Sequence, residues 1–229
     1  MDEIRKMYKD SIGELMKNTM TEEEIDAIVN GLTEKAKTIK KGDNVVHLGY
    51  YKGPVTEIDL AFYEEQLSTV GLELSSYDSS GTFQNSIQDL INHFTIVISP
   101  VLLDNILFGV AGNAVWDVIK SIAKSVKGKI KGQKLNFLSG KDISEKEITF
   151  GITASFGPDR KYDFRIDANN SDATFLQSVD KVLDFLKEHR MHTTRTGHQF
   201  GRYNATTDQW ETYDIYEEIT RIHSQQKDL

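Results

Sequence analysis

The most concentrated chemistry in this 229-residue sequence is a run of lysines near its middle. Six lysines fall between Lys120 and Lys134 with no acidic residue among them, so the local charge is +6. Clustered ammonium groups can bind phosphate or another anion, and they can equally complement the negative end of a helix and remain solvated. Both interpretations stay open. The candidate anion-binding residues are Lys124, Lys127, Lys129, Lys131 and Lys134.

Nucleic acid is not an expected partner of this lysine run. No aromatic residue is interleaved with the lysines to stack on bases, as single-stranded nucleic acid usually requires. The whole chain carries 35 acidic and 27 basic residues, a formal net charge of -8, which repels polyanions and anionic membranes.

Other residue types that could do chemistry form no enzyme signature. The chain has no cysteine, which excludes disulfides, thiolate zinc sites, iron–sulfur clusters and cysteine nucleophiles. His189, His192 and His198 could supply three imidazoles to zinc, but no HExxH pattern supports a metal site. Nucleophile-elbow and P-loop patterns are absent. A nuclease arrangement of Asp159, Lys161 and Asp163 lacks the required spacing, so no catalytic residue, metal or cofactor is predicted.

The residues from 1 to 56 are predicted to form an N-terminal helical arm. Thr21 and Glu24 match a capping box ahead of an apolar stripe that runs from Ile25 to Ile39. A short strand over 45–51 follows. The first nine residues carry charges and no apolar run, so a cytoplasmic location is expected.

An α+β domain is predicted over residues 57–190, since helical and strand periodicities occur in mixed runs. Its expected elements are a helix over 57–70 that ends at Gly71, a strand over 72–77, a helix over 83–91, a strand over 94–99, a helix from 101 to about 126, a hairpin over 148–168 and a helix over 171–189. We expect an antiparallel sheet to pack on the central apolar helix. A C-terminal extension over 191–229 is expected to hold a second hairpin, near 200–213, and a terminal helix.

The expected helix from Val101 to about Val126 is apolar over most of its circumference. Such a helix needs packing partners on several sides, which either the core of its own domain or another subunit could supply. Asp104 and Pro100 interrupt the apolar stretch, so a membrane span is not expected. The candidate interface residues on this helix are Leu103, Leu107, Phe108, Val115, Trp116 and Ile119.

Between Leu60 and Arg190 the expected order of elements includes a helix that ends at Gly71, the apolar helix that holds Trp116, a hairpin with Gly157-Pro158-Asp159 at its tip, and a closing helix from Phe175 to Leu186. This order resembles the effector-associated constant component domains of bacterial conflict systems. The resemblance implies a non-catalytic adaptor that links a sensor to an effector through self-association or contact with another protein.

Two other functions remain open at the level of sequence. The lysine segment could serve an enzyme or binding protein that acts on a phosphorylated or nucleic-acid ligand. The helix over 101–122 could serve an effector that perturbs membranes.

Overall fold

A computed structural model describes residues 39–80, 92–139, 142–190 and 197–214, together with residues 6, 9, 21–23, 25, 26, 29, 30 and 33; for 136–139, 142–144 and 146 it describes the backbone alone. The chain divides into two compact units, residues 1–41 and residues 42–229. The predicted helix 83–91 and the predicted C-terminal helix lie outside the described residues.

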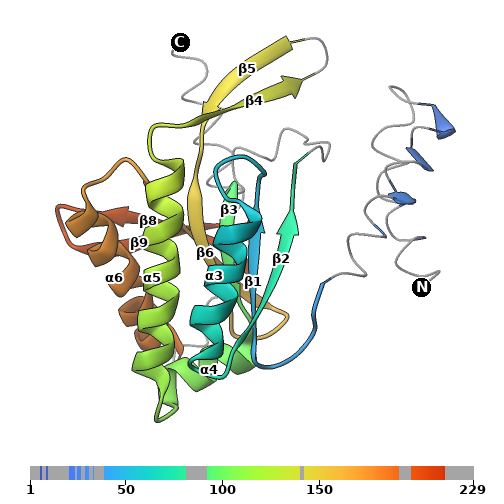
Figure 1. The fold of residues 1–229 in the computed structure, drawn as a ribbon. Helices are drawn as coiled ribbons and strands as arrows, with labels where there is room; N and C mark the ends of the chain where they lie inside the picture. Colours follow the sequence, from blue (N-terminus) through green and yellow to red (C-terminus); the bar gives the residue numbers. More distant parts are fainter. Residues whose placement is uncertain are drawn as a thin grey trace. The chain divides into compact units, whose positions relative to one another are not determined.

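The second unit contains a mixed sheet of seven strands (Figure 1). Its strand order is β2-β1-β3-β6-β7-β8-β9. The strands are β1 (Val45–Tyr50), β2 (Glu73–Asp78), β3 (Phe94–Ile98), β6 (Phe150–Ser155), β7 (Arg160–Ile166), β8 (Gly197–Asn204) and β9 (Gln209–Asp214). A separate hairpin consists of β4 (Lys134–Ser139) and β5 (Asp142–Glu147). The helices are α3 (Glu57–Ser68), α4 (Pro100–Phe108), α5 (Gly112–Ile130) and α6 (Asp172–Arg190).

The α+β class is confirmed, but the sheet is not purely antiparallel. Three strand pairs, β1 with β2, β3 with β6 and β7 with β8, run parallel. Each of these pairs is joined through a helical connection, because a parallel pair needs a crossover long enough to return the chain to the starting edge. The antiparallel pairs β6–β7 and β8–β9 are the two predicted hairpins.

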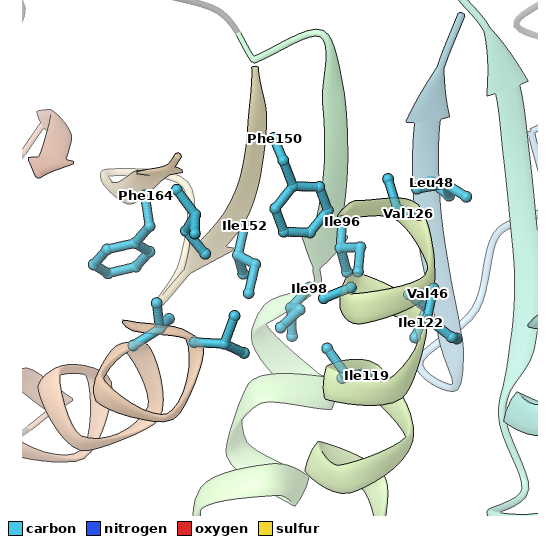
Figure 2. Packing of buried hydrophobic residues seen from close by; sticks show 14 of the residues in the cluster. Val46, Leu48, Ile96, Ile98, Ile119, Ile122, Val126, Phe150, Ile152 and Phe164 are labelled. Carbon is cyan, nitrogen blue, oxygen red and sulfur yellow. The ribbon is translucent and has the colours of Figure 1, made fainter. Parts of the chain in front are cut away.

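The core lies between one face of the sheet and the helices α3, α5 and α6, which lie side by side (Figure 1). Alternate residues of the strands point to this face. Figure 2 shows Ile119, Ile122 and Val126 of α5 directed at the apolar side chains of β1, β3 and β6. Helix α5 is therefore the central helix that the sequence predicts.

The single helix expected from Val101 to about Val126 is two helices. The chain bends by 118° between helices α4 and α5, and Gly109 between them has an extended backbone conformation. A Cβ atom at Gly112 would overlap the carbonyl oxygen of Ile106. The two glycines therefore let the chain turn sharply between two apolar helices, which periodicity alone does not reveal.

The predicted boundaries at residues 56/57 and 190/191 do not separate domains. Strand β1 lies inside the sheet between β2 and β3, and β8 and β9 extend the same sheet beyond β7. The boundary falls at residues 41/42. The position of this boundary depends on which strands pair, and hydrophobic periodicity does not show which strands are neighbours.

The N-terminal unit contains helical residues in the region where the capping-box pattern predicts a helix. Ile25 and Val29 are buried, and the Ile25 amide donates to the Thr21 carbonyl at 3.1 Å. Lys9 and Asp26 form an ion pair at 2.9 Å.

Candidate functional site

Four of the six interface candidates on the apolar helix pack inside their own unit. Leu103, Val115, Trp116 and Ile119 all belong to the buried core, and the Trp116 side chain is only 3% exposed. Their burial decides between the two alternatives that the sequence leaves open and corrects their choice as interface candidates, because the sheet and neighbouring helices already surround them. Leu107 is partly buried against the same core.

Phe108 is the candidate that remains accessible, with 67% of its surface exposed. It ends α4, and two other large apolar residues nearby are also exposed, Val101 at the start of α4 and Val110 in the turn to α5. Val101 and Phe108 are seven residues apart, which places them on the same side of the helix. Phe108 and Val110 lie at the turn between α4 and α5, and we call these two residues the α4–α5 corner.

The candidate lysines do not form one anion-binding surface. Lys127 is 2% exposed, and its ammonium group donates to the carboxylate of Asp172 and lies 5.4 Å from the centre of the Phe175 ring. The hydrogen bond from Lys127 lowers the pKa of Asp172. Lys127 therefore joins α5 to the start of α6, which corrects its assignment as an anion ligand.

Two further lysines are also engaged with acidic side chains. Lys129 lies 2.8 Å from Asp59 of α3, and its hydrogen bond lowers the pKa of that carboxyl group. Lys134 lies 3.4 Å from Glu145 across the β4–β5 hairpin. Lys124 and Lys131 are exposed. These ion pairs offset much of the +6 charge, so they favour the structural interpretation of the lysine run.

A polar cluster on the sheet face opposite α5 is the arrangement that the sequence does not predict. Thr153, Asp163 and His198 come from the adjacent strands β6, β7 and β8. The Thr153 hydroxyl donates to one carboxylate oxygen of Asp163, and the His198 Nε2–H donates to the other. The Lys161 ammonium lies 3.7 Å from the same carboxylate. We call these four residues the β7 cluster.

The Asp163 carboxylate is 14% exposed, so it is a largely buried charge. Burial acts to raise its pKa, but the hydrogen bond from His198, the charge of Lys161 and the hydrogen bond from Thr153 outweigh burial and lower the pKa. The carboxylate is therefore ionised at neutral pH.

At the level of sequence, Lys161 and Asp163 were candidates only as part of a nuclease arrangement with Asp159. The structure joins the first two to His198, 35 residues away along the chain, and Asp159 contributes its backbone carbonyl to the Gly197 amide. Lys161, Asp163 and Arg165 occupy alternate positions of β7, and apolar residues occupy the positions between them. This alternation was the sequence signal that could have indicated a charged face on the strand.

Of the three histidines considered as zinc ligands, the two that the structure describes have different contacts. His189 stacks on Phe185 with the ring centres 3.7 Å apart, whereas His198 bonds Asp163. His192 lies outside the described residues. Within the described ranges, no group of three or more histidine or acidic side chains is placed to hold a metal ion.

Comparisons of the chain with protein-family models, with curated proteins and with solved structures found no match. Among the helices that the structure describes, none is by itself long and apolar enough to cross a bilayer; α4 and α5 meet that test only as a pair bent by 118°. The class that the fold defines is an α+β protein whose mixed seven-stranded sheet packs one face against helices.

Proposed function

We propose that this chain is a non-catalytic interaction module, an adaptor of the kind used in bacterial defence or signalling, and that it self-associates through the α4–α5 corner. The observation that supports this proposal is the exposure of Phe108 and Val110 at the turn between α4 and α5, with Val101 exposed at the other end of α4. Clustered apolar residues on a surface mark contact sites more often than scattered ones do.

The charge distribution favours a second copy of the chain as the partner. The twelve residues between Asp104 and Asp117 carry no charge, and Asp104 itself pairs with Arg190 through two contacts of 2.8 and 3.1 Å. Two copies of a chain with net charge -8 repel one another elsewhere. A two-fold contact brings the same patch from both copies together, and this uncharged corner lets them approach without like-charge repulsion.

Light scattering over a range of protein concentrations tests the proposal. The wild type is expected to dimerise, and the double change Phe108→Ser with Val110→Ser is expected to give a monomer with an unchanged melting temperature, because both side chains are exposed. Ile58→Ser is the matched control, since Ile58 is 83% exposed but lies on α3. This control should still dimerise.

Two results would contradict the proposal. One is a wild type that stays monomeric at the highest attainable concentration. The other is a dimer that the double variant leaves intact. Binding of a monomeric wild type to lipid vesicles would assign the corner to a membrane surface instead.

A further inference from the structure

Helix α3 carries apolar residues on two opposite faces. Its inner face consists of Leu60, Tyr63 and Leu67, which belong to the core. Ile58 and Phe62 are four residues apart and therefore lie on one side of the helix, where Ile58 is 83% and Phe62 is 48% exposed. A helix that is apolar on two faces needs packing partners on both, and the core supplies only one of them.

The exposed side of α3 forms a continuous surface. Ala61 and Glu65 are also exposed, and at 3.6 residues per turn they lie between and beyond Ile58 and Phe62 on the side away from the core. We call Ile58, Ala61, Phe62 and Glu65 the outer α3 face. Helix α3 is the outermost helix of the row α6, α5 and α3 (Figure 1). Among the described residues, large exposed apolar side chains occur only on this face, on α4 and in the turn after α4.

The charge around this face is entirely acidic along the chain. Helix α3 contains four acidic residues and no basic residue, and no lysine or arginine occurs from residue 53 to residue 119. Asp59 pairs with Lys129 at 2.8 Å. Glu57 and Glu65 form no ion pair with any residue that the structure describes. Apolar side chains and unneutralised carboxylates therefore share the exposed side of α3.

Glu65 is unfavourably placed for the helix itself. It lies in the last turn of α3, which holds no basic residue, and an acidic residue there interacts unfavourably with the negative end of the helix dipole. Its position three residues after Phe62 places its carboxylate beside the exposed ring. Residues that break a local rule without compensation within the fold are expected at functional sites. Glu65 is therefore better explained by a ligand than by helix stability.

The charge of α3 determines what can cover this face. A second copy of the chain would bring two acidic helices together, and nucleic acid or an anionic membrane carries the same sign of charge, so all three are repelled. A segment with basic and apolar side chains matches both features of the face. Amphipathic helices present apolar side chains three, four and seven residues apart, which is also the spacing of the outer α3 face.

We propose that the outer α3 face binds a basic amphipathic helix of a partner protein. Apolar side chains of the partner contact Ile58, Ala61 and Phe62, and a lysine or arginine pairs with Glu65. This inference rests on the proposed function as an interaction module, and it names the class of partner. The surface is separate from the α4–α5 corner, so the chain can bind this partner and a second copy of itself at the same time.

Calorimetric titration of the full chain with two synthetic peptides tests the proposal. Each peptide has about 18 residues, long enough to form a helix, with leucines at spacings of three and four. One peptide carries lysine at the remaining positions, and the other carries glutamate there. The lysine peptide should bind with an affinity that falls as salt is added, and the glutamate peptide should not bind.

Variants separate binding at this face from general attraction to an acidic protein. Phe62→Ser is expected to weaken binding of the lysine peptide at least about tenfold, as for an aromatic residue at the centre of a contact. Glu65→Lys should weaken it more than Glu188→Lys does. Glu188 is the matched control, because it is exposed on α6 and the change in charge is the same. The double change Phe108→Ser with Val110→Ser should leave peptide binding unchanged.

Three results would overturn the proposal. They are equal affinity of the wild type and Phe62→Ser for the lysine peptide, equal effects of Glu65→Lys and Glu188→Lys, and no binding of the lysine peptide at all. Loss of dimerisation in Phe62→Ser would also overturn it, since a second copy would then occupy the face. If Phe62→Ser fails to fold, Ile58→Ser decides the question, because Ile58 is 83% exposed.

The same measurements distinguish this inference from the proposed self-association. A wild type that stays monomeric but binds the lysine peptide through Phe62 would support the outer α3 face and contradict the α4–α5 corner. A wild type that dimerises but does not bind the peptide would support the corner and contradict the outer α3 face.

Discussion

At the scale of the residue, Trp116 distinguishes packing in the core from contact with a partner. Its side chain is 3% exposed, so Trp116→Ala should reduce the free energy of unfolding by about 3–5 kcal/mol. Its buried Nε1–H has no hydrogen-bond partner in the described structure. Trp116→Phe removes that unpaired donor and keeps most of the aromatic ring system. It should therefore reduce the free energy of unfolding by less than about 1.5 kcal/mol.

Urea denaturation of the two variants measures both differences. Phe108→Ala is the comparison on the exposed side of the same pair of helices, and it should leave the unfolding free energy nearly unchanged. A Trp116→Ala variant as stable as the wild type would contradict the placement of this residue in the core.

Asp163 should make stability depend on pH. Its pKa in the folded state is lower than the ordinary value of 3.8, so the charged carboxylate contributes stability above the unfolded-state pKa. That contribution is lost as the pH falls through the folded-state pKa. The difference in melting temperature between wild type and Asp163→Asn should therefore be largest near neutral pH and should shrink below about pH 4.

Thr153→Val provides the companion measurement. It removes one hydrogen bond that lowers the pKa of Asp163, which brings the folded-state pKa closer to the unfolded-state value. The stability lost between neutral and acidic pH should therefore be smaller than in the wild type. If the melting temperatures of the wild type and Asp163→Asn differ by the same amount at every pH, the charge of Asp163 does not contribute to stability as described.

At the scale of the element, two glycines of α5 should respond oppositely to alanine. At Gly112 an added Cβ would overlap the Ile106 carbonyl oxygen, whereas at Gly128 it would meet no atom within 4 Å. Gly128→Ala should raise the unfolding free energy by about 0.5–1 kcal/mol, because alanine is the better helix former. Gly112→Ala should lower it by about 1–3 kcal/mol through overlap at the bend.

Thermal unfolding followed by circular dichroism gives the sign of each change. The two substitutions are the same chemically and lie in the same helix, so helix propensity alone predicts stabilisation by both. A Gly112→Ala variant as stable as Gly128→Ala would mean that the α4–α5 bend does not require glycine.

At the scale of the whole molecule, the strand order determines which fragment can fold. Residues 42–229 form one compact unit, so this fragment should unfold cooperatively. The fragment 57–190 lacks β1 from inside the sheet and lacks β8 and β9 beyond β7. It also loses Trp210, whose ring centre lies 4.9 Å from that of Phe164. This shorter fragment should not unfold cooperatively.

Chemical denaturation and circular dichroism of both fragments check this expectation. Cooperative unfolding of 57–190 would support the boundaries expected from the sequence and would contradict the division at residues 41/42.

Local patterns were enough to predict many of the elements. Alternating side chains on either side of a turn predicted the β6–β7 and β8–β9 hairpins, and both are confirmed. Gly71 adopts the left-handed φ of 76° just after α3, as a helix stop requires. The predicted closing helix over 171–189 is α6, and Ser171 accepts a hydrogen bond from the Thr174 amide as its cap. The β4–β5 hairpin was missed, because its lysine-rich and glycine-containing approach suggested a loop.

The sequence by itself determined the α+β class, most of the helices and the β6–β7 and β8–β9 hairpins, because these depend on the periodicity, caps and turns of neighbouring residues. Only the tertiary structure decided that β1 pairs with both β2 and β3, that Trp116 is core and Phe108 surface, and that Lys127 is buried against Asp172. It also decided that His198 meets Asp163 and that Arg202 lies beside Arg165. These contacts join residues 28 or more positions apart, where hydrophobic periodicity gives the face of each strand but not its neighbour.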